Sequence, residues 1–250
     1  MEQSSRIQKL SPSVAVMQPY LFPYIGYFQL IQACDIFTFY DTVSFIKGGW
    51  INRNRLSSSQ GAIYLTVPCK GISSHSKICE VQIDRNNKRF RNALTTVNQL
   101  YSRAPFFNEV FPMIAHVLDQ NHEDIASLAK QSVIAVSEYL GQSTHFHSAS
   151  ELSQDILNTS RVQRLINIVQ HFGGHKYINP AGGHTLYDRH DFVKFGITLE
   201  FLKTTIRPYK TFNGDFTPSL SIIDLLMNLP KDQVREHLES YTLHSVIENS

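Results

Sequence analysis

The sequence lacks the features that would place the protein in a membrane or in an oxidising compartment. It contains no run of about 18 apolar residues, which excludes a predicted membrane-spanning helix. Residues 1–11 are polar and hold no apolar core of a secretion signal. The three cysteines, Cys34, Cys69 and Cys79, form no CxxC pair, so reduced thiols are expected. These absences predict a soluble, cytoplasmic protein.

An excess of charge of either sign is also missing. The 250 residues include 23 basic and 21 acidic side chains, for a net charge of +2. This balance argues against general nucleic-acid binding and against binding to an anionic membrane. Any site for an anion must therefore be a local cluster of cations. The hydrophobic content of 42% fits a packed core rather than a disordered chain.

Several common catalytic motifs are absent as well. The sequence has no GxSxG elbow, no P-loop and no GxGxxG fingerprint. It also lacks a DxD motif, which disfavours a third functional option, a glycosyltransferase. His145 and His147 form an HxH pair that a strand would direct to one face, but no cysteine or carboxylate accompanies the pair. We therefore predict no metal site.

The order of predicted elements indicates an α/β fold. The run SVAVM at 13–17 is typical of a buried strand, and Pro19 and Pro23 then force a loop. A helix over 24–33 and a strand over 35–40 complete a parallel βαβ unit. Further along, the patterns predict a loop at 44–56, strands at 62–67 and 78–83, helices at 86–101, 107–118 and 123–140, a strand at 145–148, a helix at 159–172, strands at 176–178 and 197–202, and helices at 188–195, 220–228 and 231–239. We expect one domain over 1–250 with a helical insertion at about 86–140.

The run KGGWINRNR at 47–55 is the densest polar segment. Its three cations and two amides cannot all be buried unpaired, because desolvated charge is costly. One interpretation is a solvated loop. The other is a clamp for a phosphate or carboxylate, in which Lys47, Arg53 and Arg55 neutralise charge and the two arginines make bidentate contacts. Trp50 could stack on a base or a sugar, although a lone tryptophan also suits a core or its rim.

Other candidates lie at predicted element ends. Asp41 follows the second strand, at the edge where open α/β sheets bind ligands, and could orient a sugar hydroxyl or accept a proton. His184 follows a glycine-rich loop and, with Tyr187, could line a pocket. Ser221 could cap the helix that begins there, with Asp224 in its first turn. Capping is one role for this pair and ligand binding is the other.

Long blocks of the sequence resemble the WbqC-like family. The blocks are MQPYLFPYIGYFQLI at 17–31 and CDIFTFYDTVSFIKGGWINRNR at 34–55, and the similarity continues through Tyr101 and Tyr187 to SLSIIDLLMN at 219–228. The family is known mainly from gene clusters for O-antigen and related polysaccharides. The resemblance implies an enzyme that transfers or ligates an acyl or aminoacyl group onto an amino sugar. The alternative is a non-catalytic sugar-nucleotide-binding or accessory protein of the same pathway.

The resemblance also assigns candidate site residues. Its pattern points to Gln18, Pro19, Tyr20, Pro23, Tyr24, Gly26, Tyr27, Asp41, Lys47, Trp50, Asn52, Arg53, Asn54, Gly183, Tyr187, Ser221 and Asp224. We predict Asp41, Lys47 and His184 as catalytic. The others except Pro19 and Pro23, together with Arg55, are predicted to bind the substrate or nucleotide. The substrate is expected to be nucleotide-linked or carrier-linked. The cofactor stays open, with ATP and Mg²⁺ or an acyl thioester as candidates.

A second resemblance concerns Tyr24-Ile25-Gly26-Tyr27. A strand, a short loop and these residues at a helix start are similar to the HIGH-type motif of nucleotidyltransferases and pantothenate synthetase. The similarity implies a Rossmann-like, mostly parallel sheet with flanking helices, and a nucleotide held by Tyr24 and Tyr27 close to Gly26. Tyrosine donates a hydrogen bond but is not a cation at neutral pH. The alternative is an aromatic helix that simply covers a sheet.

Overall fold

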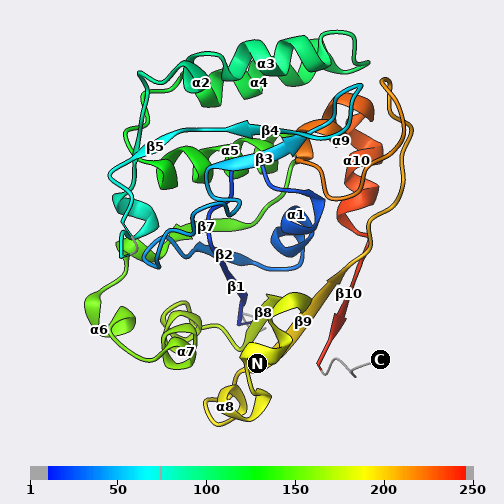
Figure 1. The fold of residues 1–250 in the computed structure, drawn as a ribbon. Helices are drawn as coiled ribbons and strands as arrows, with labels where there is room; N and C mark the ends of the chain where they lie inside the picture. The colour runs from blue at the N-terminus through cyan, green and yellow to red at the C-terminus, as the bar shows by residue number, and fades with distance from the viewer. Residues whose placement is uncertain (1–10, 74, 246–250) are drawn as a thin grey trace, which may run out of the picture.

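The computed structural model describes residues 11–73 and 75–245, which form a mixed α/β fold with a mostly parallel central sheet (Figure 1). The polar N-terminal segment, predicted to carry no secretion signal, lies outside the described residues up to residue 10. Within the described ranges, no helix combines the length and the apolar character needed to cross a bilayer.

Ten strands and ten helices are described. The strands are β1 (Ser13–Met17), β2 (Ile36–Phe39), β3 (Arg53–Leu56), β4 (Ile63–Thr66), β5 (Cys69–Lys70), β6 (Gln82–Ile83), β7 (His145–Ser148), β8 (Lys176–Pro180), β9 (Thr198–Thr204) and β10 (Tyr241–His244). The helices are α1 (Ile25–Gln32), α2 (Lys88–Arg91), α3 (Ala93–Tyr101), α4 (Phe107–Asp119), α5 (Ile125–Leu140), α6 (Gln154–Leu157), α7 (Arg161–His171), α8 (Arg189–Val193), α9 (Ile222–Asn228) and α10 (Lys231–Leu238). Three 3₁₀ turns complete the set: η1 (Ile78–Glu80), η2 (Ala149–Glu151) and η3 (Ala181–Leu186).

The central sheet has the strand order β10-β9-β8-β1-β2-β7, and only β10 is antiparallel to its neighbour. From β1 the chain moves outward through β2 to β7, then returns to the other side of β1 through β8 and β9. The direction therefore reverses between β1 and β8. In open α/β sheets a crevice opens at the carboxyl ends of the two strands that flank such a reversal, and ligands bind there. The Rossmann-like prediction is confirmed.

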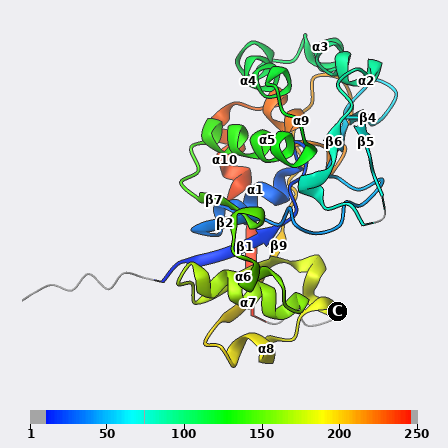
Figure 2. The same cartoon turned by 90° about the vertical axis from the view of Figure 1, so that its left-hand side faces the viewer.

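Helices cover both faces of this sheet. Ala15, Phe37 and Phe39 point into a large core shared with α1, α5, α9 and α10, whereas Val14 and Val16 point into a smaller core shared with α7 and α8. The alternation follows from the two-residue period of a strand, and the βαβ order places the covering helices. Figure 2 shows α6, α7 and α8 on one side of β1, opposite α1, α5 and α10.

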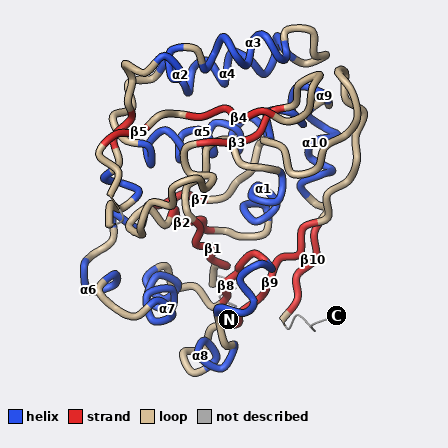
Figure 3. Tube along the Cα trace, viewed as in Figure 1, coloured by secondary structure: helices blue, strands red, loops and turns tan. Residues whose placement is uncertain are grey.

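A long connection separates β2 from β7. It contains the antiparallel β3–β4 and β5–β6 hairpins, followed by α2 to α5 (Figure 3). The helical insertion expected at about 86–140 corresponds to α2–α5. The hairpin β3–β4 lies between α2–α3 and the β1–α1 region, which places the basic run 47–55 beside the central sheet.

Three element predictions in this connection are wrong. The predicted loop at 44–56 contains β3, whose residues alternate between partly exposed arginines and the buried Asn54 and Leu56. The predicted strand at 78–83 is a 3₁₀ turn followed by a two-residue strand. The predicted helix at 86–101 is two helices that meet at Asn92, which leaves helical geometry with φ −94° and ψ 1°. The sequence patterns also missed three short elements along the chain, namely β5, α6 and β10.

Candidate functional site

The loop from Gln18 to Tyr24, called the β1–α1 loop here, is held in a strained form. Phe22 has a φ of 38°, a backbone conformation that residues other than glycine rarely adopt. Its backbone N–H donates to Ser132 Oγ at 2.9 Å. Its carbonyl oxygen accepts from Asn54 Nδ2 at 2.9 Å and from Ser221 Oγ at 2.7 Å. A strained backbone conformation persists only where surrounding contacts hold it in place, as these three hydrogen bonds do for Phe22. Residues of this kind cluster at functional sites.

Tyr24, Gly26 and Tyr27 also shape this loop. The Tyr27 side chain is buried and its hydroxyl donates to the Gln18 carbonyl oxygen at 2.8 Å. A methyl group at Gly26 would collide with the ring of Tyr24, so that ring already lies over the start of α1. The space that the HIGH-type resemblance assigns to a nucleotide is thus filled by the chain itself. These residues fix the loop between the two cavities described next.

A cavity of about 920 Å³ lies at the reversal of the sheet, and we call it the switch-point pocket. Its walls come from the carboxyl ends of β1, β2 and β8, the start of α7, η3 and the segment 42–46. Its lining residues are Val16, Met17, Gln18, Tyr20, Tyr40, Thr42, Val43, Ser44, Ile46, His75, Lys77, Arg161, Arg164, Asn179, Pro180, Gly182, Gly183, Leu186 and Tyr187. None of these carries a carboxylate. The pocket is therefore suited to an anion.

Two arginines on α7 face this pocket. Arg164 donates to the Tyr40 hydroxyl at 3.0 Å and to the Thr159 carbonyl at 2.9 Å, which fixes its guanidinium. Arg161 is exposed and has no hydrogen bond or ion pair to any described residue. Burial raises the pKa of Tyr40 and of Tyr187, while the positive charge of Arg161 acts on both in the opposite direction. Arg161 therefore adds a positive charge to the pocket that is paired with no described acidic side chain.

The glycine turn η3 forms another wall. A methyl group at Gly183 would overlap the amide of Asn179, so the backbone at Gly183 packs directly against the Asn179 side chain. The His184 Nδ1 lies 2.9 Å from the Ala181 carbonyl oxygen. A carbonyl oxygen only accepts, so Nδ1 carries the proton and Nε2 is left with a lone pair when the ring is neutral. His184 can therefore act as a base at the turn that borders the pocket.

A second cavity of about 320 Å³, the aromatic pocket, lies on the other side of the β1–α1 loop. Its lining residues are Tyr20, Pro23, Tyr24, Trp50, Asn54, Arg55, Thr204, Ile206 and Ser219. Tyr20 lines both cavities, so they adjoin at its side chain. The Arg55 guanidinium donates to the Ser219 carbonyl at 3.1 Å and lies 5.9 Å from the Trp50 ring centroid. Flat rings and one held cation suit a sugar or another ring with a polar edge.

Asp41 and Lys47 lie outside both pockets. Asp41 is fully buried, with Oδ2 at 3.0 Å from Lys130 Nζ and both oxygens bonded to Ser150. These contacts tie the end of β2 to α5 and η2. Lys47 is exposed in the turn before Trp50. The clamp predicted from 47–55 is dispersed, because Arg55 belongs to the aromatic pocket and Arg53 lines a different cleft.

Asp224 and Ser221 have defined contacts at α9. Ser221 caps the helix, accepting from the Ile223 N–H at 3.3 Å. The buried Asp224 accepts from the Tyr101 hydroxyl at 2.9 Å and from the Tyr209 hydroxyl at 2.5 Å. Burial raises the pKa of Asp224, and the two hydroxyl donors partly offset that effect. The pair thus holds α9 against the β1–α1 loop and α3.

The predicted residues fall into three groups. Those lining the switch-point pocket are Gln18, Tyr20, Gly183 and Tyr187, and those lining the aromatic pocket are Tyr20, Tyr24, Trp50, Asn54 and Arg55. Those lining neither pocket are Gly26, Tyr27, Asp41, Lys47, Asn52, Arg53, His184, Ser221 and Asp224.

Sequence reasoning missed eight polar residues of the switch-point pocket, namely Tyr40, Thr42, Ser44, His75, Lys77, Arg161, Arg164 and Asn179. One signal was present for the arginines. They are spaced i, i+3 directly after a serine N-cap, which places both on one face at a helix start.

The comparisons with known proteins place the chain in a family. The family model described as WbqC-like protein family matches residues 18–236. An uncharacterized protein of Mycobacterium tuberculosis (strain ATCC 25618 / H37Rv) is 32% identical over 222 residues, which cover 86% of this chain and 93% of that protein. Residues 18–236 include every residue that lines the aromatic pocket, and all of those that line the switch-point pocket except Val16 and Met17.

Proposed function

The chain belongs to the WbqC-like protein family, and we propose that it is an enzyme of bacterial surface-polysaccharide biosynthesis that transfers or ligates an acyl or aminoacyl group onto a nucleotide-linked amino sugar. One observation carries this proposal. The cavity at the reversal of the sheet is lined by Lys77, Arg161 and Arg164 and by no carboxylate. A diphosphate is the anion that such a cavity in an open α/β sheet suits best.

Different walls of the switch-point pocket would contact different parts of the ligand. In the proposal, Arg161 and the amino end of α7 attract the diphosphate, because a helix start carries partial positive charge. Arg164 is fixed by Tyr40 and presents a preorganised guanidinium. The backbone at Gly182 and Gly183 approaches the ligand closely, since no side chain intervenes there. The volume of about 920 Å³ is in the range of small-molecule sites.

Acyl transfer needs a second compartment, and the aromatic pocket adjoins the first at Tyr20. In the proposed step, the amine nitrogen of the sugar attacks the carbonyl carbon of an activated acyl donor. The C–N bond forms, the bond to the leaving group breaks, and the ammonium proton passes to a base. His184 is the candidate base, because its Nδ1 proton is held by Ala181 and its Nε2 can accept. Asp41 supports the edge of the sheet through Lys130 instead of contacting the substrate.

A second candidate function is a non-catalytic binder of sugar nucleotides. The observation that favours it is the absence of carboxylates among the residues lining both described pockets. A binder needs the cations and the tyrosines but no base. Turnover separates the two functions, because a binder would retain the ligand without consuming any acyl donor.

The test is calorimetric titration of the purified protein with UDP- and dTDP-linked amino sugars. We expect saturable binding by the wild type, and binding about tenfold weaker or more by Arg161→Gln, because one charge-assisted contact is lost. Arg161 is exposed and unpaired among the described residues, so folding should be unaffected.

Arg189→Gln is the matched control, because Arg189 is an exposed arginine at the start of α8 that lines neither pocket. Binding that is equally strong in the wild type and Arg161→Gln would overturn the assignment of the pocket. Binding without amide formation, across ATP-activated acids and acyl thioesters, would favour the binder over the enzyme.

A further inference from the structure

Acidic residues are missing from two long stretches of the chain. Residues 42–79 and 85–108 contain no aspartate or glutamate, yet each stretch carries five lysines and arginines. The whole chain has a net charge of only +2, so this is a strong local segregation of charge. The fold brings the two stretches together, because the first contains β3 and β4 and the second contains α2 and α3.

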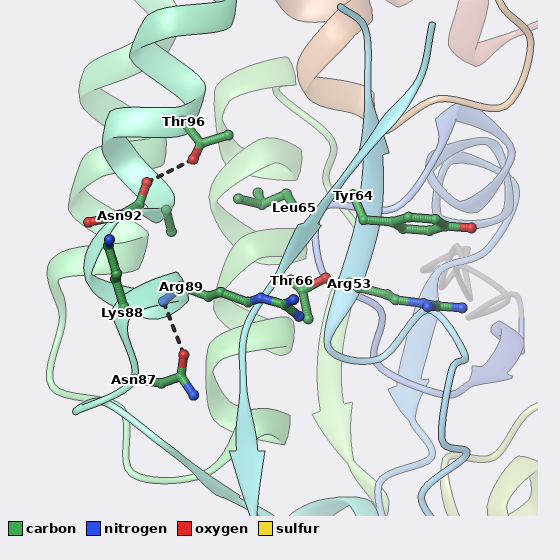
Figure 4. Close-up of a pocket in the computed structure, with 10 residues that line it drawn as sticks. Arg53, Tyr64, Leu65, Thr66, Asn87, Lys88, Arg89, Asn92 and Thr96 are labelled. Carbon is green, nitrogen blue, oxygen red and sulfur yellow. Dashed lines mark hydrogen bonds between the residues drawn. The ribbon is translucent and has the colours of Figure 1, made fainter.

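A cleft of about 810 Å³, called the basic cleft here, lies where these stretches meet. It is lined by Arg53, Tyr64, Leu65, Thr66, Asn87, Lys88, Arg89, Asn92, Ala93 and Thr96. It shares no residue with the switch-point pocket or the aromatic pocket. Figure 4 shows Arg89 extending from α2 toward Thr66 of β4.

The cations of the cleft lack anionic partners. Arg53 donates only to the carbonyl oxygens of Gly48 and Gly49, and these bonds leave its positive charge uncompensated. Lys88 and Arg89 are exposed and form no ion pair with any described residue. Three positive groups that line one cleft without a counter-charge are costly unless a ligand or solvent compensates them.

An aromatic platform adjoins these cations. Tyr64 is 50% exposed, and the Arg53 guanidinium lies 4.5 Å from its ring centroid. Figure 4 shows the two side chains running alongside each other, on the side of the hairpin away from α2 and α3. In antiparallel register Arg53 is paired with Thr66, toward which Arg89 extends, so the platform borders the cationic part of the cleft. Flat rings beside arginines stack on nucleobases.

We propose that the basic cleft is a second ligand site, which binds a nucleoside polyphosphate with its base on Tyr64 beside Arg53 and its phosphates on Lys88 and Arg89. The asparagine and threonine side chains of the wall supply hydrogen bonds, and Leu65 and Ala93 form the apolar floor. The volume suits a single nucleotide. The site is independent of the ligand in the switch-point pocket. ATP and coenzyme A both present this chemistry.

The experiment is titration of the full chain with ATP, with coenzyme A, with inorganic tripolyphosphate and with a short RNA strand. Lys88→Gln/Arg89→Gln removes two exposed cations without removing any ion pair to a described residue. Arg189→Gln/Lys194→Gln on α8 is the matched control for total charge. Tyr64→Ala removes the platform, and Tyr64→Phe retains it. The same variants are titrated with UDP-glucosamine.

We expect ATP or coenzyme A to bind the wild type, with affinity falling about tenfold or more in Lys88→Gln/Arg89→Gln and in Tyr64→Ala, but not in Tyr64→Phe or the α8 control. The tighter of the two ligands identifies the source. The affinity for UDP-glucosamine should instead fall only in Arg161→Gln. The two proposed sites can therefore be disproved independently of each other. No ATP or coenzyme A binding, equal losses in the α8 control, or tripolyphosphate binding as tightly as ATP would overturn the proposal. Binding of a short RNA strand by a protein that does not bind ATP would also overturn it.

Discussion

Asn54 Nδ2 lies 2.9 Å from the carbonyl oxygen of Phe22, and this hydrogen bond joins β3 to the strained β1–α1 loop across 32 residues. The same amide nitrogen also donates to the Leu21 carbonyl at 3.1 Å, and the Asn54 side-chain oxygen accepts from the Arg55 N–H at 2.8 Å. One buried side chain thus sets the shape of the loop that separates the two pockets.

Replacing Asn54 with alanine should therefore loosen this loop. The change removes the Asn54 donor from the Leu21 carbonyl and leaves the Phe22 carbonyl with Ser221 Oγ alone. An unsatisfied buried polar group costs about 1–3 kcal/mol. We expect unfolding in urea to show a loss of that size, together with weaker sugar-nucleotide binding. Asn86→Ala is the control, since Asn86 is exposed. A stability equal to wild type would show that the loop does not depend on Asn54.

The two glycines of η3 should respond differently to alanine. Around Gly182 nothing would meet the added methyl group, whereas at Gly183 it would overlap the Asn179 amide. Asn179 is buried and accepts from the Tyr177 hydroxyl at 3.1 Å, so it cannot move freely. Gly183→Ala should lose about 1–3 kcal/mol of stability and bind sugar nucleotide more weakly. Gly182→Ala should stay within about 0.5 kcal/mol of wild type. Equal behaviour of the two variants in urea titrations would contradict this account.

Asp224 should make stability depend on pH. Burial raises its pKa in the folded state above the ordinary value of 3.8, so folding favours the protonated carboxyl. That contribution is complete below the ordinary value and is lost as pH rises through the raised value. Asp224→Asn cannot ionise, so its stability relative to wild type should improve between pH 4 and neutral pH. Urea midpoints measured across that range check this. A difference that does not change with pH would exclude the titration of Asp224.

His184 should be needed for turnover rather than for binding. Asparagine can donate to the Ala181 carbonyl as Nδ1 does, but it offers no basic nitrogen. We expect His184→Asn to retain the affinity for sugar nucleotide and to lose roughly 10²–10⁴-fold in turnover, the usual contribution of a general base. Calorimetry and a coupled assay of amide formation report the two quantities. Undiminished turnover would transfer the role of base to another group, of which His75 lines the switch-point pocket.

Local patterns predicted the central sheet well but the site only in part. The run from 13 to 40 was readable because an apolar strand, two prolines and an aromatic helix follow one another directly. β3 was missed because arginines occupy its outer positions, and polarity resembles a loop when only one face is buried. The hydrogen bond from Arg164 to Tyr40 was not predictable, because it depends on where α7 crosses the sheet.

Only some of the residues to which the family resemblance points line the two pockets. Gln18, Tyr20 and Tyr187 line the switch-point pocket. Asn54 and Ser221 instead hold the Phe22 carbonyl, a role that lies outside any motif and requires three-dimensional contacts. A sequence block can therefore mark a site without showing which of its residues reach the ligand.

Photoaffinity labelling with 5-azido-UDP-glucosamine, followed by peptide mapping, tests whether the switch-point pocket binds the sugar nucleotide. We expect the label to attach to peptides containing residues 18–20, 40–46, 161–164 or 179–187, and unlabelled UDP-glucosamine to compete for this attachment. We also expect Arg161→Gln to lower the labelling. Competed labelling that maps to residues 87–96, or to α8, would contradict the assignment of the sugar nucleotide to the switch-point pocket.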